Sequence, residues 1–398
     1  MTTITSPATP KKLNAGGMQK YTMIIMLLLV TVFFTITTGG KILSPQNITN
    51  LIAQNAYVFV LATGMLLCIL TGGNIDLSVG SVVCFVGAIG AILMANGVNM
   101  WIAIVAMLVL GTLIGAWQAS WIAYLRIPPF IVTLAGMLIF RGLSNVVLNG
   151  RTVSVNNPLF LQLFGGGANC YVPDFATVEG VNVLTLVLGG LICLAFLFIQ
   201  LNNRRVRAQK GYDTESMLVM SAKTIAIIAV IAFFSYKLSQ YKGIPTSLIW
   251  VAVIVLIYGY ITSKTTVGRY FYAVGGNEKA TKLSGIDTNK IYFLAYTNIG
   301  LLSAVAGMLT IARMSSAQPT YGQNYEMDAI SSCFIGGASA YGGTGTVAGV
   351  IVGATLMGVI NLGMSIMGVD ANWQKVVKGL VLLAAVIFDV VSKRNKSN

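Results

Sequence analysis

The chain has 398 residues, of which 56% are hydrophobic and only 9% are charged. Water-soluble domains usually carry about 25% charged residues, so this composition excludes a soluble fold and indicates several membrane-spanning helices. The net charge of +14 is explained by basic residues in short loops on one side of a bilayer, and we exclude nucleic-acid binding.

The composition also limits the chemistry. The chain has no histidine, and its five cysteines form no CxxC pair. We therefore expect no metal site, no haem, no other cofactor and no disulfide framework. The apolar stretches are continuous rather than alternating, which predicts helices and not a β-barrel. The fold class predicted is an all-α polytopic membrane protein with about 10–12 transmembrane helices.

Twelve apolar segments are long enough to consider as spans, the tenth being short. They lie at about 21–38, 50–71, 79–97, 101–125, 129–148, 182–201, 223–238, 247–262, 291–312, 329–342, 346–366 and 373–391. Basic residues concentrate in alternate connections, which predicts that both chain ends are cytoplasmic. Removing the short tenth segment would place the basic tail outside, so this segment is retained.

These spans divide the chain into regions. Residues 1–20 form a predicted cytoplasmic tail, 21–392 the transmembrane domain and 393–398 a second cytoplasmic tail. Within the domain, 149–181 is the longest outer loop and 263–290 a cytoplasmic loop. The sequence contains no G-x-x-x-x-G-K-[ST] phosphate loop, so we expect the chain not to hydrolyse ATP and not to be an enzyme.

Two segments echo each other. The stretch 74–81 opens one apolar run and 326–332 opens another, and the glycine patterns at 111–116 and 349–354 follow in the same order. By the span count these copies start at opposite faces, which predicts an inverted internal repeat of the kind found in transporters. Chance similarity within membrane sequence is the alternative.

Two polar breaks are candidates for the pathway or gate. In the first, Asp76 with Asn74 and Ser78 lies between two spans, where a charge either faces a cavity or caps the next helix. In the second, an outer loop leads into a helix start, where amides, tyrosines and carboxylates could contact a hydroxylated solute or a delivery protein. The residues of this second group are Gln318, Tyr325, Glu326 and Asp328.

The glycine run 336–345 looks like a nucleotide loop, but neither a preceding strand nor a suitably spaced acidic residue accompanies it. We predict a tight turn between a half-helix and the next span. Arg141, Lys375 and Lys378 are expected to extend toward the membrane surface, with a partner inside the bundle as the alternative for Arg141.

The most informative segment is the polar island 268–286. Asn277 is a predicted N-cap for a short helix ending near Ser284, with Gly285 as its stop and Glu278 in the first turn. The aromatic residues beside it favour docking on a partner over a purely solvated loop. The candidate coupling residues are Gly275, Gly276, Asn277, Glu278, Ala280, Leu283 and Gly285.

The segments 71–81, 128–137, 268–286, 316–319 and 326–330 occur in an order that resembles the inner-membrane permeases of bacterial ABC importers for monosaccharides, closest to the xylose-type and multiple-sugar members. The resemblance runs from about residue 45 to 392. It implies a permease homodimer in the bacterial cytoplasmic membrane that forms the pathway. A separate ABC ATPase would bind inside and an extracytoplasmic sugar-binding protein outside.

In that resemblance the segment 275–285 corresponds to the helix that couples the permease to the ATPase. The chain departs from the shorter ribose and galactoside permeases by the segment 182–238, which we predict to be an inserted helical hairpin. Two other classes stay open. One is an ion-coupled secondary transporter that uses Asp76 or Asp328, and the other is a polytopic membrane enzyme.

Overall fold

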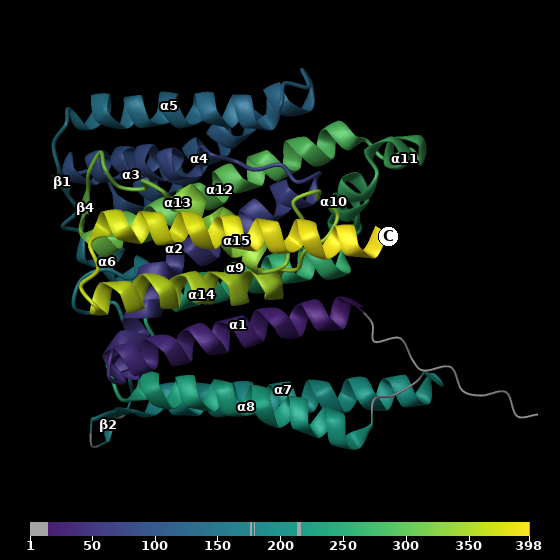
Figure 1. Ribbon diagram of the computed structural model, residues 1–398. Helices are drawn as coiled ribbons and strands as arrows, with labels where there is room; N and C mark the ends of the chain where they lie inside the picture. Colours follow the sequence, from purple (N-terminus) through teal and green to yellow (C-terminus); the bar gives the residue numbers. More distant parts are fainter. Residues whose placement is uncertain (1–14, 176, 179, 213–215, 398) are drawn as a thin grey trace, which may run out of the picture.

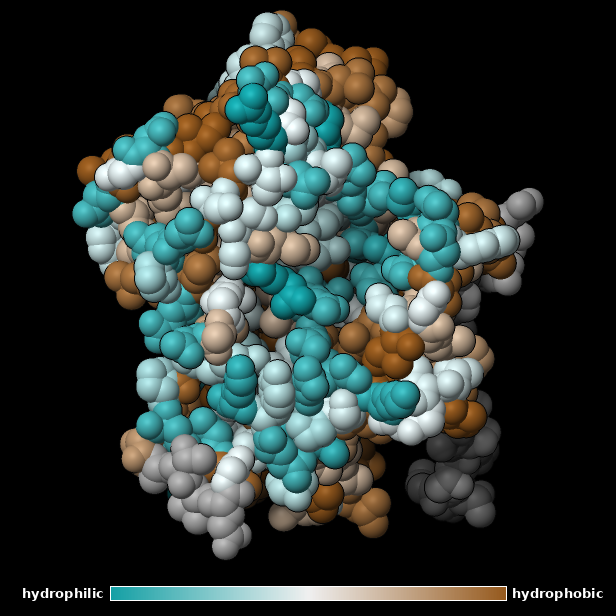
Figure 2. Space-filling view, turned by 90° about the vertical axis from the view of Figure 1, so that its left-hand side faces the viewer, coloured by the Kyte–Doolittle hydropathy of each residue, from teal (hydrophilic) through white to brown (hydrophobic). Residues whose placement is uncertain are grey.

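Long helices run side by side between two faces of the molecule in the computed structural model (Figure 1), which describes residues 15–175, 177–178, 180–212 and 216–397. The first face carries the short helix α11 (Glu278–Leu283), and the second carries strand β4 (Ser316–Ala317), paired with β1 (Val153–Ser154). We call them the α11 face and the β4 face. Seen end-on, the β4 face is polar across its middle and hydrophobic around its edge (Figure 2).

The described residues form fifteen α-helices and four two-residue strands. The remaining elements are α1 (Ala15–Thr37), η1 (Lys41–Leu43), α2 (Pro45–Leu70), α3 (Val79–Ala95), α4 (Met100–Ala123), α5 (Pro129–Leu148), α6 (Pro158–Phe164), β2 (Thr177–Val178), β3 (Val181–Asn182), α7 (Val183–Gln209), α8 (Met217–Ser239), α9 (Thr246–Lys264), α10 (Thr266–Gly276), α12 (Thr288–Met314), α13 (Tyr325–Ile335), α14 (Val347–Ile366) and α15 (Ala371–Ser397).

The predicted all-α membrane fold is confirmed. Every predicted span except the tenth is helical over most of its length, and eight helices in the described residues are long and apolar enough to cross a membrane: α2, α4, α5, α7, α8, α9, α12 and α14. Three predicted boundaries were wrong. The helix α1 begins at Ala15 inside the predicted tail, whose residues 1–14 lie outside the described residues. At the other end, α15 continues to Ser397.

The third wrong boundary is the tenth span, predicted at 329–342. The helix there is α13, which has only 11 residues and ends at Ile335. At 1.5 Å per residue it covers about 17 Å, which is too short to cross a membrane. A peptide of tight turns, 336–346, completes the passage to the α11 face, as predicted for the glycine run. Gly343 in this peptide donates its N–H to the carbonyl of Leu70 at the end of α2, at 3.0 Å.

The predicted inverted repeat is visible in the order and direction of the helices. In the first copy α2 runs toward the α11 face, and the peptide 71–78 returns into the bundle, where α3 begins. In the second copy α12 runs toward the β4 face, and the peptide 315–324 returns to the start of α13. The helix α12 packs on α3 and α4, and α2 packs on α13 and α14. The two copies are therefore equivalent in contacts and opposite in direction.

The two returning helices begin close together inside the bundle. A Cβ atom added to Gly80, at the start of α3, would lie 2.1 Å from the carbonyl oxygen of Gly322 and 2.5 Å from Oε2 of Glu326. Tyr57, midway along α2, hydrogen-bonds Asp328 in the first turn of α13. Both helices therefore begin well inside the bundle, in contact through backbone that only glycine permits.

The core and the periphery differ sharply in burial. In both α2 and α12, 78% of the most apolar window is buried, against 11% in α7 and 6% in α8. The helices α7 and α8 pack mainly on each other and lie at the edge of the bundle (Figure 1). Their apolar residues thus face outward, as expected for a helical pair surrounded by lipid.

Candidate functional site

The short helix α11 has the local structure that its sequence predicts. Oδ1 of Asn277 accepts a hydrogen bond from the N–H of Ala280 at 3.0 Å, which caps the first turn. At the other end Gly285 has a φ of +82°, and its N–H bonds to the carbonyl of Lys282. The side chain of Leu283 is 90% exposed. The helix therefore presents an apolar side chain to the surroundings on a polar face.

Glu278 faces its own chain. Its Oε1 lies 2.6 Å from Nη1 of Arg126 in the α4–α5 loop, and Oε2 accepts a hydrogen bond from the hydroxyl of Tyr292 at 3.2 Å. Thr288 donates to Oε1 as well. Partial burial acts to raise the pKa of this carboxyl, but the hydrogen bond and charge of Arg126, with the two hydroxyls, outweigh it and hold the pKa below its usual value.

Arg126 contacts several residues of α12 in addition to Glu278. Its Nη2 also donates to the hydroxyl of Thr288 at 3.0 Å and to Oδ1 of Asn289 at 2.5 Å, and its guanidinium lies 5.3 Å from the ring centroid of Tyr292. The sequence analysis did not single out Arg126, because a loop arginine 152 positions from Glu278 gives no signal in one sequence. These contacts fix α11 to α12 and to the α4–α5 loop.

Gly275 lies where α10 meets the end of α2 and the peptide 336–346. A Cβ added there would lie 1.7 Å from the carbonyl oxygen of Leu70 and 2.5 Å from the nitrogen of Gly343. The neighbouring Gly276, by contrast, has no described atom within 4 Å of such a Cβ. Gly73 similarly approaches Ala340, so the peptides 71–73 and 340–343 touch backbone to backbone. We call this contact the glycine junction.

The first pathway group is buried and locally bonded. Oδ1 of Asp76 accepts from both the N–H (2.8 Å) and the hydroxyl (2.7 Å) of Ser78. The hydroxyl of Ser78 is within 3.0 Å of the amide of Gln118 on α4. Asn74 donates to the carbonyl of Thr71. The Asp76 carboxylate thus holds Ser78, the residue before α3, whose own side chain makes no capping hydrogen bond to that helix.

The second group surrounds the start of α13. The rings of Tyr325 and Tyr57 stack with centroids 3.6 Å apart. Asp328 is 1% exposed and forms an ion pair with Nζ of Lys378 on α15 at 2.9 Å. The prediction that Lys378 extends to the membrane surface was wrong, because its partner is a buried carboxylate. The sequence did contain a signal for this pair, because charged residues inside a membrane are rare and usually pair with each other.

The loop before α13 is held from α5. Nη1 of Arg141 donates to the carbonyls of Pro319 (3.2 Å) and Tyr321 (2.7 Å). Arg141 therefore has partners inside the bundle, which was the alternative to a position at the membrane surface. The carbonyl of Gln318, in the same loop, lies 3.5 Å from Sγ of Cys84 on α3. Both repeats therefore fix the peptide that leads into α13.

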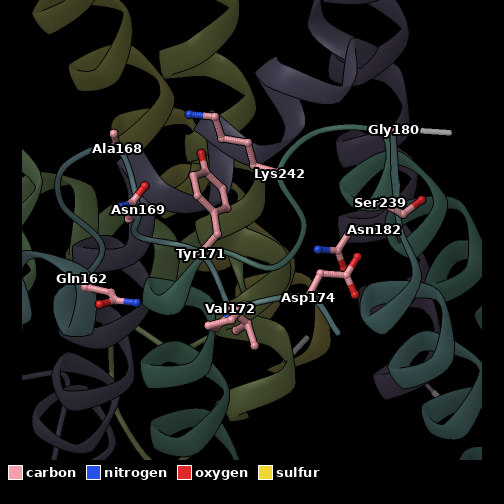
Figure 3. Close-up of a pocket in the computed structure, with 11 residues that line it drawn as sticks. Gln162, Ala168, Asn169, Tyr171, Val172, Asp174, Gly180, Asn182, Ser239 and Lys242 are labelled. Carbon is pink, nitrogen blue, oxygen red and sulfur yellow. The ribbon is translucent and has the colours of Figure 1, made fainter. Parts of the chain in front are cut away.

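A cavity of about 500 Å³ opens on the β4 face beside the α7–α8 hairpin (Figure 3). Asp174 accepts the N–H groups of Val183 (3.0 Å) and Leu184 (3.1 Å) and so caps α7. Nζ of Lys242 lies 5.6 Å from the ring centroid of Tyr171, beside which it stands in Figure 3. The cavity lies between the α7–α8 hairpin and the loop that connects α6 to β2.

Comparison with known proteins decides the family. The model of the branched-chain amino acid transport system permease component matches residues 47–386. The chain belongs to this family. It is 37% identical to the xylose transport system permease protein XylH of Haemophilus influenzae over 96% of this chain and 99% of that protein. No solved structure matches the chain significantly.

Two further relatives cover nearly the whole chain. The XylH protein of Escherichia coli K12 is 36% identical over 96% of this chain and 94% of that protein. The ribose import permease protein RbsC of the same strain is 32% identical over 94% of this chain and 95% of its own length. The predictions of a permease family and of a transport subunit that is not itself an enzyme are confirmed. Family membership implies an ATPase and a binding protein as partners.

Proposed function

We propose that this chain forms the membrane pathway of an ATP-driven, binding-protein-dependent importer of a monosaccharide of the xylose and ribose class. The observation that carries the proposal is similarity over nearly the full length of this chain and of three sugar permeases, at 32–37% identity. The polar lining around Tyr57 and Tyr325 supports it, because hydroxylated solutes are recognised by amides, hydroxyls and aromatic rings.

We place the α11 face in the cytoplasm of a bacterium whose cytoplasmic membrane holds the chain. Support comes from the basic residues around α10 and α11, since short cytoplasmic connections are enriched in Lys and Arg. The helix α1 begins and α15 ends toward this same face (Figure 1), so both termini are assigned to the cytoplasm. The basic residues are Arg126, Lys264, Arg269, Lys279, Lys282 and Lys290.

The ATPase is proposed to bind α11 through Leu283, Ala280 and the exposed side of the helix. Leu283 is an unusual residue to leave 90% exposed on a polar loop, and a partner surface would bury it. Glu278 has a different proposed role: it holds α11 against Arg126 and α12 so that the helix and the bundle move together.

Motion of α11 is proposed to reach the pathway through the glycine junction. Gly275, next to the last residue of α10, lies against Leu70 at the end of α2 and Gly343 in the peptide 336–346, so a displacement of α10 displaces backbone in both. Leu70 is followed by the peptide that leads to α3, and the peptide 336–346 follows α13. These two short helices begin together inside the bundle. Atoms in van der Waals contact without a flexible side chain between them transmit displacement with little loss.

A second permease copy is proposed to complete the pathway, as the family resemblance implies. The extracytoplasmic sugar-binding protein is proposed to dock on the β4 face. The polar character of that face and the cavity beside Tyr171 and Lys242 support this assignment. Burial raises the pKa of Tyr171 to about 12, so its hydroxyl remains a hydrogen-bond donor at any physiological pH.

Reconstitution tests the proposal. The chain, its ATPase and its binding protein are placed in liposomes, and uptake of labelled D-xylose and D-ribose is measured with ATP inside the compartment that the ATPase faces. The proposal predicts uptake that requires ATP and both partners and that continues with a protonophore. Uptake by the chain alone that collapses with a protonophore would instead establish the ion-coupled transporter.

A further inference from the structure

A second cavity lies inside the bundle, among α2, α12, α13, α14 and α15. Its volume is about 310 Å³, at the lower end of the range for small-molecule sites. The lining contains Asn55, Tyr57, Arg313, Tyr325, Asn361 and Lys378. It includes residues from both repeats, and Tyr325 is the first residue of the returning helix α13. The cavity therefore lies where the two repeats meet.

One wall of the cavity is aromatic and fixed. The stacked rings of Tyr57 and Tyr325 are 15° from parallel. The hydroxyl of Tyr57 donates to Oδ2 of Asp328 at 2.7 Å, which fixes the position of the ring. A flat aromatic surface held in this way suits the C–H face of a pyranose or furanose ring.

Two polar groups of the lining are unused within the described residues. Oδ1 of Asn361 is buried and accepts no hydrogen bond there, although the amide nitrogen lies 3.4 Å from Oδ1 of Asn55. The guanidinium of Arg313 is partly buried and has no hydrogen-bond or carboxylate partner in the same residues. A buried polar group without a partner destabilises the protein, so a ligand that bonds to both groups is favoured at this position.

The two unused groups require a ligand that donates to Asn361 and accepts from Arg313. A hydroxyl group does both, and the parallel N–H groups of a guanidinium match two adjacent hydroxyl oxygens. Arg313 is the cation of this lining without a carboxylate partner among the described residues, because Lys378 is already paired with Asp328 at 2.9 Å. A carboxylate can accept from Arg313 but cannot donate to Asn361, so the two groups together favour a polyhydroxylated ring over a carboxylate.

We propose that this cavity is the site at which the permease itself holds the transported monosaccharide, with Arg313 and Asn361 as hydroxyl contacts and Tyr57 with Tyr325 as the ring platform. The proposal rests on the proposed function, since it assigns a position to that solute. The platform takes one ring from α2 and one from α13, so a displacement of α13 relative to α2 would separate the rings and weaken binding.

Saturation-transfer difference NMR, which detects weak ligands, tests the site directly. D-xylose is added to the full-length permease in lipid nanodiscs, and the signal is compared among wild type, Asn361→Leu, Arg313→Gln and the control Asn169→Leu. Asn169 lines the other cavity, so its variant changes the same amide without touching the proposed site. We expect the signal to fall at least fivefold in the two site variants and to be unchanged in the control.

The same variants are then assayed in the complete importer. We expect Asn361→Leu and Arg313→Gln to change the ratio of D-xylose to D-ribose uptake while ATPase stimulation by the binding protein is kept. Equal NMR signals in all variants, a loss of ATPase stimulation in parallel with uptake, or stronger competition by D-xylonate than by D-xylose would each overturn the site. If the wild-type importer transports neither sugar, the proposed function itself fails.

Discussion

Glu278 and Arg126 are 152 positions apart in the chain, yet their side chains approach to 2.6 Å and join the short helix α11 to the loop between α4 and α5. Both side chains are about two-fifths exposed, so water screens the pair. The ion pair therefore adds little to the free energy of unfolding, and its main effect is to fix the position of α11. The pair makes α11, which offers Leu283 to a partner, part of the same body as α12.

The first prediction concerns this pair. Glu278→Gln removes the charge and weakens a half-exposed ion pair worth about 1 kcal/mol or less, so ATP-driven uptake should fall by about fivefold at most. The swap of Arg126→Glu with Glu278→Arg restores opposite charges and should recover part of the activity. Uptake is measured in proteoliposomes with equal amounts of permease. A swap that is worse than both single variants would contradict the positioning role.

A pH dependence follows from the lowered pKa of Glu278. The pKa of Glu278 is lower when the carboxyl is paired with Arg126 than when it is free. The pair therefore stabilises the position of α11 above the free pKa of about 4.3, and this stabilisation is lost as the pH falls through the lower pKa of the paired carboxyl. A spin label attached through Leu283→Cys should therefore stay restricted from about pH 8 to 5 and become mobile below about pH 4. In the Glu278→Gln background it should be more mobile throughout that range.

The glycine junction gives a matched pair of variants. Gly275→Ala places a methyl group 1.7 Å from a backbone oxygen of Leu70, so α10 must shift, and we expect uptake to fall at least tenfold. The methyl group of Gly276→Ala would meet no described atom within 4 Å, so this variant should keep near-normal uptake. Both proteins are compared for ATPase subunit binding and uptake. Equal activity would show that close contact at the junction is not required.

The buried pair of Asp328 and Lys378 should behave differently from the exposed one. Asp328→Asn leaves an unpaired buried ammonium, and loss of one partner of a buried pair costs about 3–5 kcal/mol. The double variant Asp328→Asn with Lys378→Met removes both charges and should regain most of the thermal stability. Thermal unfolding of the detergent-purified protein measures this. A double variant no more stable than Asp328→Asn would count against the pair.

The sequence predicted the helices, the repeat and the cap at Asn277, because each depends on local residue types or on hydrophobic periodicity. It failed where structure depends on residues far apart. The end of α13 at Ile335 was missed because the distribution of charges required a crossing at this point, and a short helix followed by a peptide completes that crossing as a full span does. The partner of Glu278 was missed because one sequence does not show which distant surface charges meet, whereas the partner of Asp328 could have been proposed from the rarity of charges inside the membrane.

The central claim is that α11 contacts the ATPase, and site-directed cross-linking tests it most directly. A photoactivatable cross-linker is attached at Leu283→Cys and, as the matched control, at Phe175→Cys, a 69% exposed residue in the loop between α6 and β2. The assembled importer is then illuminated. We predict that position 283 cross-links to the ATPase subunit and that position 175 does not. A cross-link to the ATPase from position 175 alone would contradict both the contact and the assigned orientation.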